Sequence, residues 1–217
     1  MSEGPNERIR VRRIPDRGRY DRATIDPIVD ETLLCHVAWT TPQGPACVPL
    51  LHARVDDTLY VHGAPATRLA RQARDPEGGL GVDVCLTVTL LDGLILARSA
   101  FHHSVNYRSV VVYGRATPVE DDATKRHALE VLIRRIYPGR ETECRPPSDK
   151  ELRATAVLSI PLDDASAKIR TGPPVDDAPD LALDHWAGVI PLHVERGAPS
   201  PAPDLREGIE TPDALRP

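Results

Sequence analysis

The sequence is poor in aromatic residues and has no long apolar run, and both shortages narrow the class of protein. Its 217 residues include one phenylalanine and two tryptophans, so a packed core must consist mainly of valine, leucine, isoleucine and alanine. No apolar segment is long enough to cross a bilayer, and the N-terminal stretch lacks the apolar part of a secretory signal. We therefore expect a globular domain that lies in the cytoplasm and has no membrane partner.

The cysteines argue against metal-binding and disulfide-rich classes. No two of the four have the short spacing of a zinc or redox motif. Three of them lie in apolar, strand-like stretches, where a free cysteine behaves as a small hydrophobic residue. We expect neither a structural zinc site nor a disulfide framework from Cys35, Cys47, Cys85 and Cys144.

Lysine is scarce, and arginine carries most of the positive charge. The formal net charge is −5, and lysine occurs only at Lys125, Lys150 and Lys168. Four arginines near the N-terminus could suggest a nucleic-acid partner, but the chain is acidic and no aromatic residue lies between them. We interpret residues 1–18 as a solvated arm and expect no nucleic-acid partner. The arginines are Arg8, Arg10, Arg12 and Arg13.

Strand patterns dominate the chain between this arm and a proline-rich tail. The expected strands cover 33–40, 46–55, 58–63, 81–91, 107–119, 154–162, 166–170 and 186–194, and the expected helices cover 22–32, 65–74 and 121–137. Asp92-Gly93 is expected to turn the chain, and Asp21 to cap the first helix. Six to eight strands with two or three inserted helices predict a mainly β fold with α inserts, an antiparallel barrel over residues 19–195. Residues 196–217 contain five prolines and no aromatic residue, so we expect a disordered tail.

Pro49 gives information about the second strand. A proline cannot donate a hydrogen bond to a neighbouring strand, so one side of this strand must be unpaired there. We expect something other than a strand to lie against that side.

The stretch LYVHGAPATRLAR, from Leu59 to Arg71, is a candidate phosphate site. A strand ends at His62-Gly63, and a helix is expected to start near Pro65 with Arg68 in its first turn. The free amide groups of a helix start attract anions, Thr67 adds a hydroxyl group, and Arg68 adds a cation. The alternative is an arginine that is simply exposed on a helix.

The stretch SAFHHSVNYRSVVVYG contains adjacent histidines. If the backbone is extended, His102 and His103 point to opposite faces and cannot share an ion, and no further ligand residue follows at suitable spacing. We therefore expect no metal site. No nucleophile elbow and no glycine-rich phosphate loop occurs, and Ser104 is better explained as a turn residue than as a nucleophile.

Taken in order, several stretches resemble one known family. They include CHVAW, VPLLHARVDDTLYVHGAPATR, the long stretch from Val88 to Ala116, ASAKIRTGPP and WAGVIPL. From about Arg13 to Leu192 the chain is similar to the FMN-binding split-barrel flavoproteins related to pyridoxamine 5'-phosphate oxidase. Within that family it is most similar to the flavin-nucleotide-binding and nitroimidazole-reductase-like branch. The resemblance implies a split β-barrel that binds FMN.

The resemblance also implies where the flavin lies. Its ring would run along the strand that holds Cys47, Val48, Pro49, Leu50 and Leu51, and its phosphate would lie near Val61, His62, Thr67 and Arg68. Further contacts would come from Arg108 and Ser109 and, across a dimer interface, from Lys168 and Arg170. The remaining pocket residues would be His102, His103, Asn106 and Tyr107.

These features lead us to expect a homodimeric FMN-dependent oxidoreductase of a small molecule. The C-terminal aromatic and Arg-His arrangement of the true oxidases is missing, so oxidation of pyridoxamine phosphate itself is not expected. No side chain is assigned as catalytic. Two alternatives stay open: a flavin-binding module without catalytic activity, and the same barrel with a deazaflavin or a haem.

Overall fold

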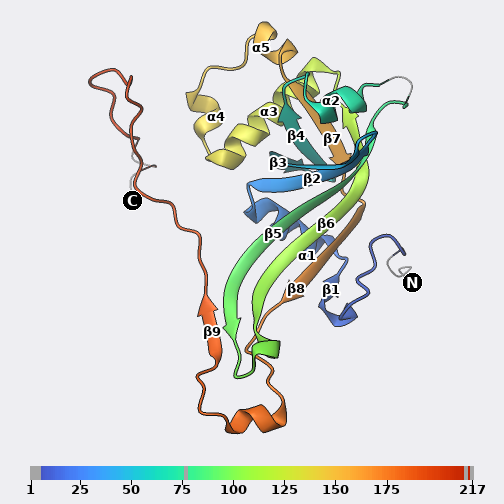
Figure 1. Cartoon of the computed structure of the whole chain (residues 1–217). Helices are drawn as coiled ribbons and strands as arrows, with labels where there is room; N and C mark the ends of the chain where they lie inside the picture. Colours follow the sequence, from blue (N-terminus) through green and yellow to red (C-terminus); the bar gives the residue numbers. More distant parts are fainter. Residues whose placement is uncertain (1–5, 76–77, 213–214, 216–217) are drawn as a thin grey trace.

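Nine antiparallel strands form one sheet, six of which close into a barrel (Figure 1). The protein is represented by a computed structural model that describes residues 6–75, 78–212 and 215. The strands are β1 (Gly18–Arg19), β2 (Leu34–Thr41), β3 (Gly44–Val55), β4 (Thr58–Gly63), β5 (Val82–Leu96), β6 (Ser104–Pro118), β7 (Ala156–Pro161), β8 (Asp164–Arg170) and β9 (Gly188–Pro191). The sheet order is β1-β8-β6-β7-β4-β3-β2-β5-β9, and a further pairing of β5 with β6 closes the ring. The predicted antiparallel split barrel is confirmed; the edge strands bring the number above the expected six to eight.

Helices cover parts of this sheet. They are α1 (Arg22–Glu31), α2 (Arg68–Ala73), α3 (Asp122–Ile136), α4 (Arg140–Glu143) and α5 (Asp149–Arg153), with short 3-10 turns η1 (Pro15–Arg17), η2 (Ala100–His102) and η3 (Ala178–Ala182). Asp21 caps α1 as expected, since its carboxylate accepts a hydrogen bond from the Thr24 amide at 2.8 Å. Helices α4 and α5 were not predicted. The signal for α5 was Ser148 followed by Glu151, which form a capping box, whereas α4 has no side-chain cap.

The barrel interior follows the alternation of apolar residues. Val82, Val84, Leu86 and Val88 of β5 are buried in one core cluster, with Ile25, Ile28 and Val29 of α1 packed into the same cluster. Each such side chain contributes about 1.5–3 kcal/mol when fully buried. The alternation therefore identified the inward face of β5 correctly.

The expected turn at Asp92-Gly93 is wrong. Strand β5 continues to Leu96 with an irregularity between Leu91 and Gly93, and the chain reverses at η2 instead. A side chain at position 93 would approach the Ile190 carbonyl oxygen of β9 to 3.0 Å. The glycine therefore permits close contact between strands rather than a reversal of the chain.

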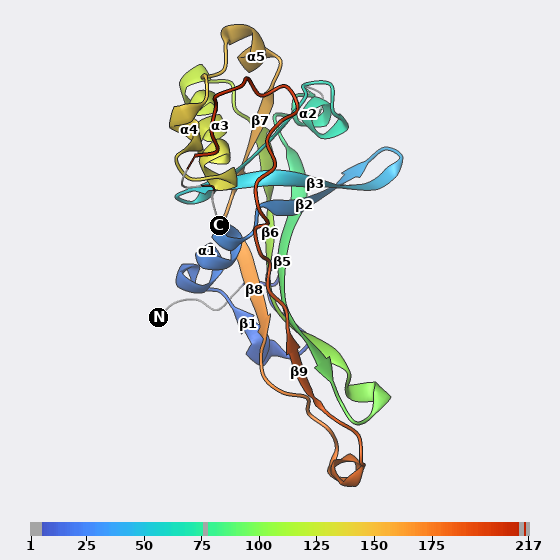
Figure 2. The same cartoon turned by 90° about the vertical axis from the view of Figure 1, so that its left-hand side faces the viewer.

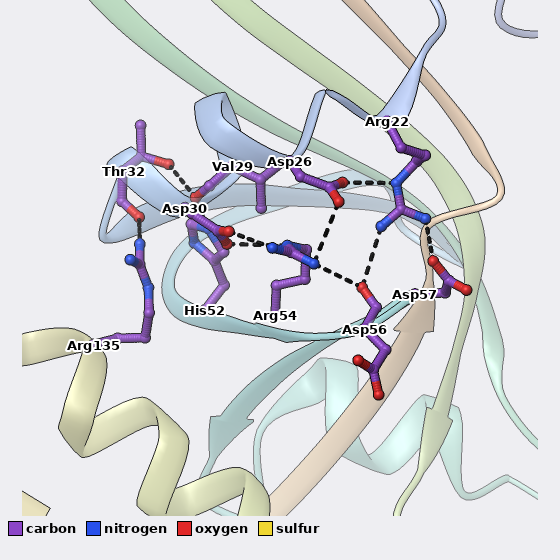
Figure 3. Close-up of polar contacts among 10 residues, drawn as sticks. All are labelled: Arg22, Asp26, Val29, Asp30, Thr32, His52, Arg54, Asp56, Asp57 and Arg135. Carbon is purple, nitrogen blue, oxygen red and sulfur yellow. Dashed lines mark hydrogen bonds and ion pairs between the residues drawn. The ribbon is translucent and has the colours of Figure 1, made fainter. Parts of the chain in front are cut away.

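The α1 helix is fastened to the β3–β4 hairpin by a polar cluster (Figure 3). Arg54 of β3 donates to Asp30 from its Nε at 3.1 Å and lies 3.4 Å from Asp26. His52, fully buried beside it, is 3.0 Å from the Val29 carbonyl oxygen through Nε2. At the C-terminal end of α1, Arg135 of α3 donates to the carbonyl oxygen of the C-cap residue Thr32 at 2.6 Å. The cluster fixes the position of α1 at one end of the barrel.

The two terminal segments differ in how they contact the fold. Residues 6–13 dock on β8, because Asn6 donates to Asp164 at 2.7 Å and the Val11 amide donates to the Tyr20 hydroxyl at 2.9 Å. The arm is thus held in place, although most of its side chains are exposed. Figure 2 shows the C-terminal segment passing in front of the strands after β9, without a helix or strand over 196–212. Its disorder stays a prediction; residues 1–5 of the arm, and 213–214 and 216–217 of the tail, lie outside the described residues.

None of the described helices is long and apolar enough to span a bilayer.

Candidate functional site

Strand β3 presents a free edge over its first eight residues. It pairs with β2 from Gly44 to Leu51, but with β4 only from His52 to Val55. In the described part of the chain, the other side of residues 44–51 therefore has no strand partner. The unpaired side inferred from Pro49 is confirmed.

Beside this strand lies a largely apolar cavity of about 160 Å³. Val48 and Leu50 point into it, whereas Cys47 and Pro49 are exposed on the other face of β3 and Leu51 packs against a separate cluster with Ala53. This split follows from strand alternation, which places neighbouring residues on opposite faces. The walls are Trp39, Val48, Leu50, Val61, His62, Gly63, Thr67, Arg68, Leu69, Ala70, Ala156 and Leu158.

His62 is a polar residue in the wall of this cavity. Its Nδ1 is buried and has no hydrogen-bond partner among the described residues. Burial lowers the pKa of His62 below its ordinary value, so the imidazole is neutral at pH 7. His62 is thus a neutral wall of the cavity with one buried nitrogen that no described residue satisfies.

Arg68 supplies the positive charge at the cavity mouth. It is the first residue of α2, it is exposed, and it forms no ion pair with any described residue. Helix α2 starts three residues later than expected, because Thr67 is its N-cap and accepts from the Ala70 amide at 3.4 Å. The Thr67 hydroxyl is therefore partly used by the helix, and Arg68 carries most of the affinity that this corner offers to an anion.

Arg108, by contrast, is already matched to two carboxylates. Its guanidinium donates to Asp92 at 2.8 and 3.0 Å and to Glu31 at 2.8 Å. These contacts raise the pKa of Arg108 and lower the pKa of Glu31. Arg108 thus joins α1 to the long β5–β6 hairpin, and its contact with a flavin stays a prediction.

Ser109 and Lys168 lie apart from the cavity. They face each other across the β6–β8 ladder and line a second groove of about 240 Å³, together with Arg8 to Arg13 of the N-terminal arm. Arg170, two residues further along β8, is buried and donates to the Asn106 side chain at 2.7 Å. The core residues Ala165, Ala167 and Ile169 alternate with these two, so Lys168 and Arg170 share the other face as predicted. Asn106 in turn donates to the Gly172 carbonyl at 3.1 Å, while Tyr107 beside it is half-buried.

The two histidines lie at the tip of the β5–β6 hairpin. Figure 1 shows that this hairpin projects beyond the barrel, alongside β9. His102 Nε2 lies 3.2 Å from Asp177 Oδ2, and His103 Nδ1 lies 3.0 Å from the Ser99 carbonyl oxygen. His102, Asp177 and Asp180 offer ligand atoms within 4.8 Å of one another. The expectation of no metal overlooked this group, because both aspartates are distant in sequence.

The predicted site residues are therefore not gathered in one place. Val48, Leu50, Val61, His62, Thr67 and Arg68 share the cavity, and Ser109 and Lys168 share the groove. The others lie outside both: Asn106, Tyr107 and Arg108 on β6, Arg170 on β8, His102 and His103 at the hairpin tip, and Cys47, Pro49 and Leu51 on the part of β3 that faces away from the cavity. The prediction missed Trp39, whose indole nitrogen donates to Gln72 at 3.1 Å, and Ala156 and Leu158 of β7. Strand alternation marks Trp39 as inward-facing, but only the pairing of β4 with β7 brings the last two to the cavity.

Comparison with known proteins identifies the family. The family model for pyridoxamine 5'-phosphate oxidase matches residues 21–169. The flavocytochrome Anf3 from Azotobacter vinelandii is 39% identical, with a TM-score of 0.90 over 99% of this chain and 97% of that one. A FAD and haem binding protein from Mycobacterium smegmatis is 34% identical, with a TM-score of 0.85 over 92% and 95%.

A more distant match is a proposed 5-nitroimidazole antibiotic resistance protein from Bacteroides thetaiotaomicron. It is 26% identical, with a TM-score of 0.57 over 70% of this chain and 86% of that one. No curated protein matches. On the family model and the two solved structures above 30% identity, the chain belongs to the pyridoxamine 5'-phosphate oxidase family of split-barrel proteins.

Proposed function

We propose that the protein binds a flavin in the cavity beside β3 and uses it to exchange electrons with a small molecule. The observation that carries the proposal is the cavity itself, which joins the free edge of β3 to the unpaired cation Arg68. Family membership supports the same assignment. The cellular compartment in which we expect this activity is the cytoplasm.

The residues of the cavity suit a flavin. An isoalloxazine ring needs apolar surface for its faces and hydrogen-bonding groups for its polar edge. Trp39, Leu50 and Leu158 provide the first, and the buried His62 Nδ1 and the free backbone edge of β3 provide the second. Arg68 would hold a phosphate at the mouth.

The protein's own part is binding and orientation. When bound, the flavin supplies hydride or single-electron transfer. His62 stays neutral because burial lowers its pKa, so it can bond to the ring without adding charge. Arg68 would balance phosphate charge, and the apolar walls would keep water from the ring. A module that binds flavin without catalysis would share these features and differ only in lacking turnover of a reductant.

The choice between FMN and FAD concerns the part of the ligand outside the cavity. Both flavins share the ring and the first phosphate, which Arg68 would contact. The sequence alone led us to FMN, whereas the M. smegmatis relative binds FAD. We propose FAD on the strength of that similarity, and flavin released on denaturation distinguishes the two by chromatography.

A haem is the second proposed cofactor. The family model ends at residue 169, and 48 residues follow it. The M. smegmatis structure covers 92% of this chain and leaves only about 17 of the 217 residues unmatched, so its match continues beyond residue 169. Two relatives described as a flavocytochrome and a haem-binding protein thus match at least part of the segment that follows the family model, the segment that contains β9.

The hairpin beside β9 contains a suitable ligand for haem iron. A carbonyl oxygen can only accept, so His103 Nδ1 must donate to Ser99, and Nε2 keeps the lone pair that a metal requires. His103 is exposed, as are Phe101 and Trp186 of the same projection, which offer apolar contact to a porphyrin.

We propose a homodimer, with the flavin at its two-fold interface. The projecting hairpin and β9 expose apolar side chains at Leu94, Phe101, Trp186 and Ile190, which a second copy could cover. Light scattering of the purified protein tests this, and a flavin-loaded monomer would contradict it.

One experiment tests both cofactors. The purified full-length chain should show the absorption bands of an oxidised flavin together with a Soret band. Bleaching of the flavin bands by a reductant and their return in the presence of an acceptor would establish turnover. A colourless protein that takes up no added flavin would refute the main proposal, and flavin bands without a Soret band after haem addition would refute the second.

A further inference from the structure

A groove on the outer face of β6 and β8 gathers positive charge. It has a volume of about 240 Å³ and lies between these strands and the N-terminal arm. The strands belong to the stretch that the family model matches, whereas the arm precedes it. We propose that this groove binds the adenosine diphosphate half of FAD and selects FAD over FMN, an assignment that rests on the proposed flavin-binding function.

The charges in the groove are incompletely matched. Five cations line it, namely Arg8, Arg10, Arg12, Arg13 and Lys168. Two carboxylates lie near them: Glu7 contacts Arg10 at 2.7 Å and Arg12 at 3.2 Å, and Asp164 is 3.9 Å from Arg8. Over the described ranges 6–75, 78–212 and 215, Arg13 and Lys168 have no ion-pair partner. The local excess of positive charge fits a diphosphate.

The arm that carries these arginines is held in a defined conformation. The Asn6 side chain accepts from the Arg8 and Ile9 amides at 3.0 and 3.2 Å, donates to Asp164 at 2.7 Å, and so closes a turn on the strand. Ile9 is buried, and the Val11 amide donates to the Tyr20 hydroxyl. Because the backbone is already ordered, little further ordering opposes ligand binding.

The floor of the groove suits a nucleoside rather than a bare phosphate ion. Val111 provides apolar surface for a base, and the Ser109 and Ser166 hydroxyl groups lie close by for a ribose. The Arg8 guanidinium stacks over the Tyr113 ring at 4.9 Å, so a flat cationic surface is present too. The combination of apolar floor, hydroxyls and cationic rim fits an adenosine diphosphate moiety.

The groove and the flavin cavity share no lining residue. In Figure 1 the arm lies beside β8, away from α2 and β4, which form the cavity at the other end of the barrel. A single FAD that uses both therefore has its ring in one copy of the chain and its adenosine half on a second copy. The sequence led us to expect Lys168 at FMN across a dimer interface; the groove keeps the dimer interface but assigns Lys168 to the adenosine half of FAD instead.

The test compares three flavins on the full-length chain, before and after removal of the two unpaired cations. FAD, FMN and riboflavin are titrated by fluorescence into wild-type protein, the Arg13→Ala/Lys168→Ala variant and the control Arg145→Ala. Arg145 is an exposed arginine that pairs with Glu151 far from the groove. We expect the double variant to lose about ten- to a hundredfold in affinity for FAD, with FMN and riboflavin almost unchanged.

Each result decides the proposal. Unchanged FMN affinity shows that the variant is folded, and ADP should compete with FAD in the wild type but not in the variant. Equal losses for FAD and FMN, or no loss for either, overturn the groove assignment while flavin binding in the cavity stands. A wild-type chain that binds no flavin overturns the proposed function, and the groove assignment falls with it.

Discussion

Two arginine-rich regions of this molecule differ in whether their charges are matched. Where α1 packs on the β3–β4 hairpin, Arg54 contacts the carboxylates of Asp26 and Asp30 and the Asp56 carbonyl oxygen (Figure 3). In the groove below the N-terminal arm, Arg13 and its neighbours outnumber the nearby carboxylates. The first region fastens two elements together, and the second leaves its charge available to solvent or to a ligand.

The difference shows how to separate structural arginines from binding arginines. Matched charges between two elements stabilise the packing, and little attraction remains for an incoming anion. Unmatched cations repel one another within a Debye length, and a bound anion relieves this repulsion. By the same criterion Arg108 belongs with the structural group, whereas Arg68 belongs with the binding group.

The largest effect on stability should come from His52 in the matched region. His52→Ala removes a fully buried ring and its contact with the Val29 carbonyl, so we expect a loss of about 2–4 kcal/mol in the free energy of unfolding. Urea unfolding followed by circular dichroism measures it. His36→Ala, an exposed histidine on the neighbouring strand, is the control; equal losses in both variants would contradict the buried role.

Arg68→Ala should weaken FMN binding by about ten- to a hundredfold and leave riboflavin binding nearly unchanged. FMN carries a phosphate dianion and riboflavin does not, so only the former loses a charge-assisted contact. Arg71→Ala, one turn further along α2 and outside the cavity, is the matched control. Fluorescence titration decides the matter, and equal losses for both flavins would remove Arg68 as a phosphate ligand.

Arg54→Ala removes the ion pairs with Asp26 and Asp30 and should lower the free energy of unfolding by about 1–2 kcal/mol. The value lies between those of exposed and buried ion pairs, because the Arg54 side chain is 21% exposed. Flavin affinity should not change, since Arg54 lies outside both cavities. Thermal melting and flavin titration of one sample test this, and a loss of flavin affinity at unchanged stability would contradict it.

Acidification should destabilise the protein through its buried histidines. Burial lowers the pKa of His52 and of His62, with Arg135 adding to the effect at His52. In the unfolded chain these histidines take up protons near the ordinary histidine pKa of about 6.5, whereas in the folded chain they do so only at lower pH. Their contribution to the free energy of unfolding is therefore fully present above about pH 6.5 and declines as the pH falls below it. Urea midpoints between about pH 7.5 and pH 5.5 measure this, and His52→Ala should flatten the slope. A slope unchanged in that variant would contradict the assignment to His52.

The sequence predicted those parts of the structure that depend on local pattern. The alternation in Val82 to Val88, the Asp21 cap and the free edge at Pro49 follow from backbone periodicity and hydrogen bonding, and all three are present. The expected turn at Gly93 failed, because a glycine needed for close strand contact looks the same in sequence as a glycine needed in a turn.

The candidate site was only partly predictable, since it is assembled from distant strands. The stretch from Val61 to Arg68 is continuous and was found, but Leu158 reaches the cavity only through the pairing of β4 with β7. The matching of Arg108 by Glu31, 77 positions away, likewise has no local signal. The docking of the N-terminal arm depends on Asn6 meeting Asp164, which no short-range pattern indicates.

The smallest expected effect on stability is that of removing Arg13, one of the cations in the groove. Arg13→Ala should change the free energy of unfolding by less than about 0.5 kcal/mol. Arg13 is exposed and has no ion-pair partner among the residues that the structure describes, and such a cation contributes little to the folded state. Removing it also lowers the repulsion among the remaining groove cations, so a slight gain in stability at low salt is the favoured direction. Urea unfolding at low and high salt measures both, with the Arg54→Ala variant as the matched counterpart from the other region. A loss comparable to that of Arg54→Ala would show that Arg13 fastens the arm to the sheet, and the groove would then be a structural contact.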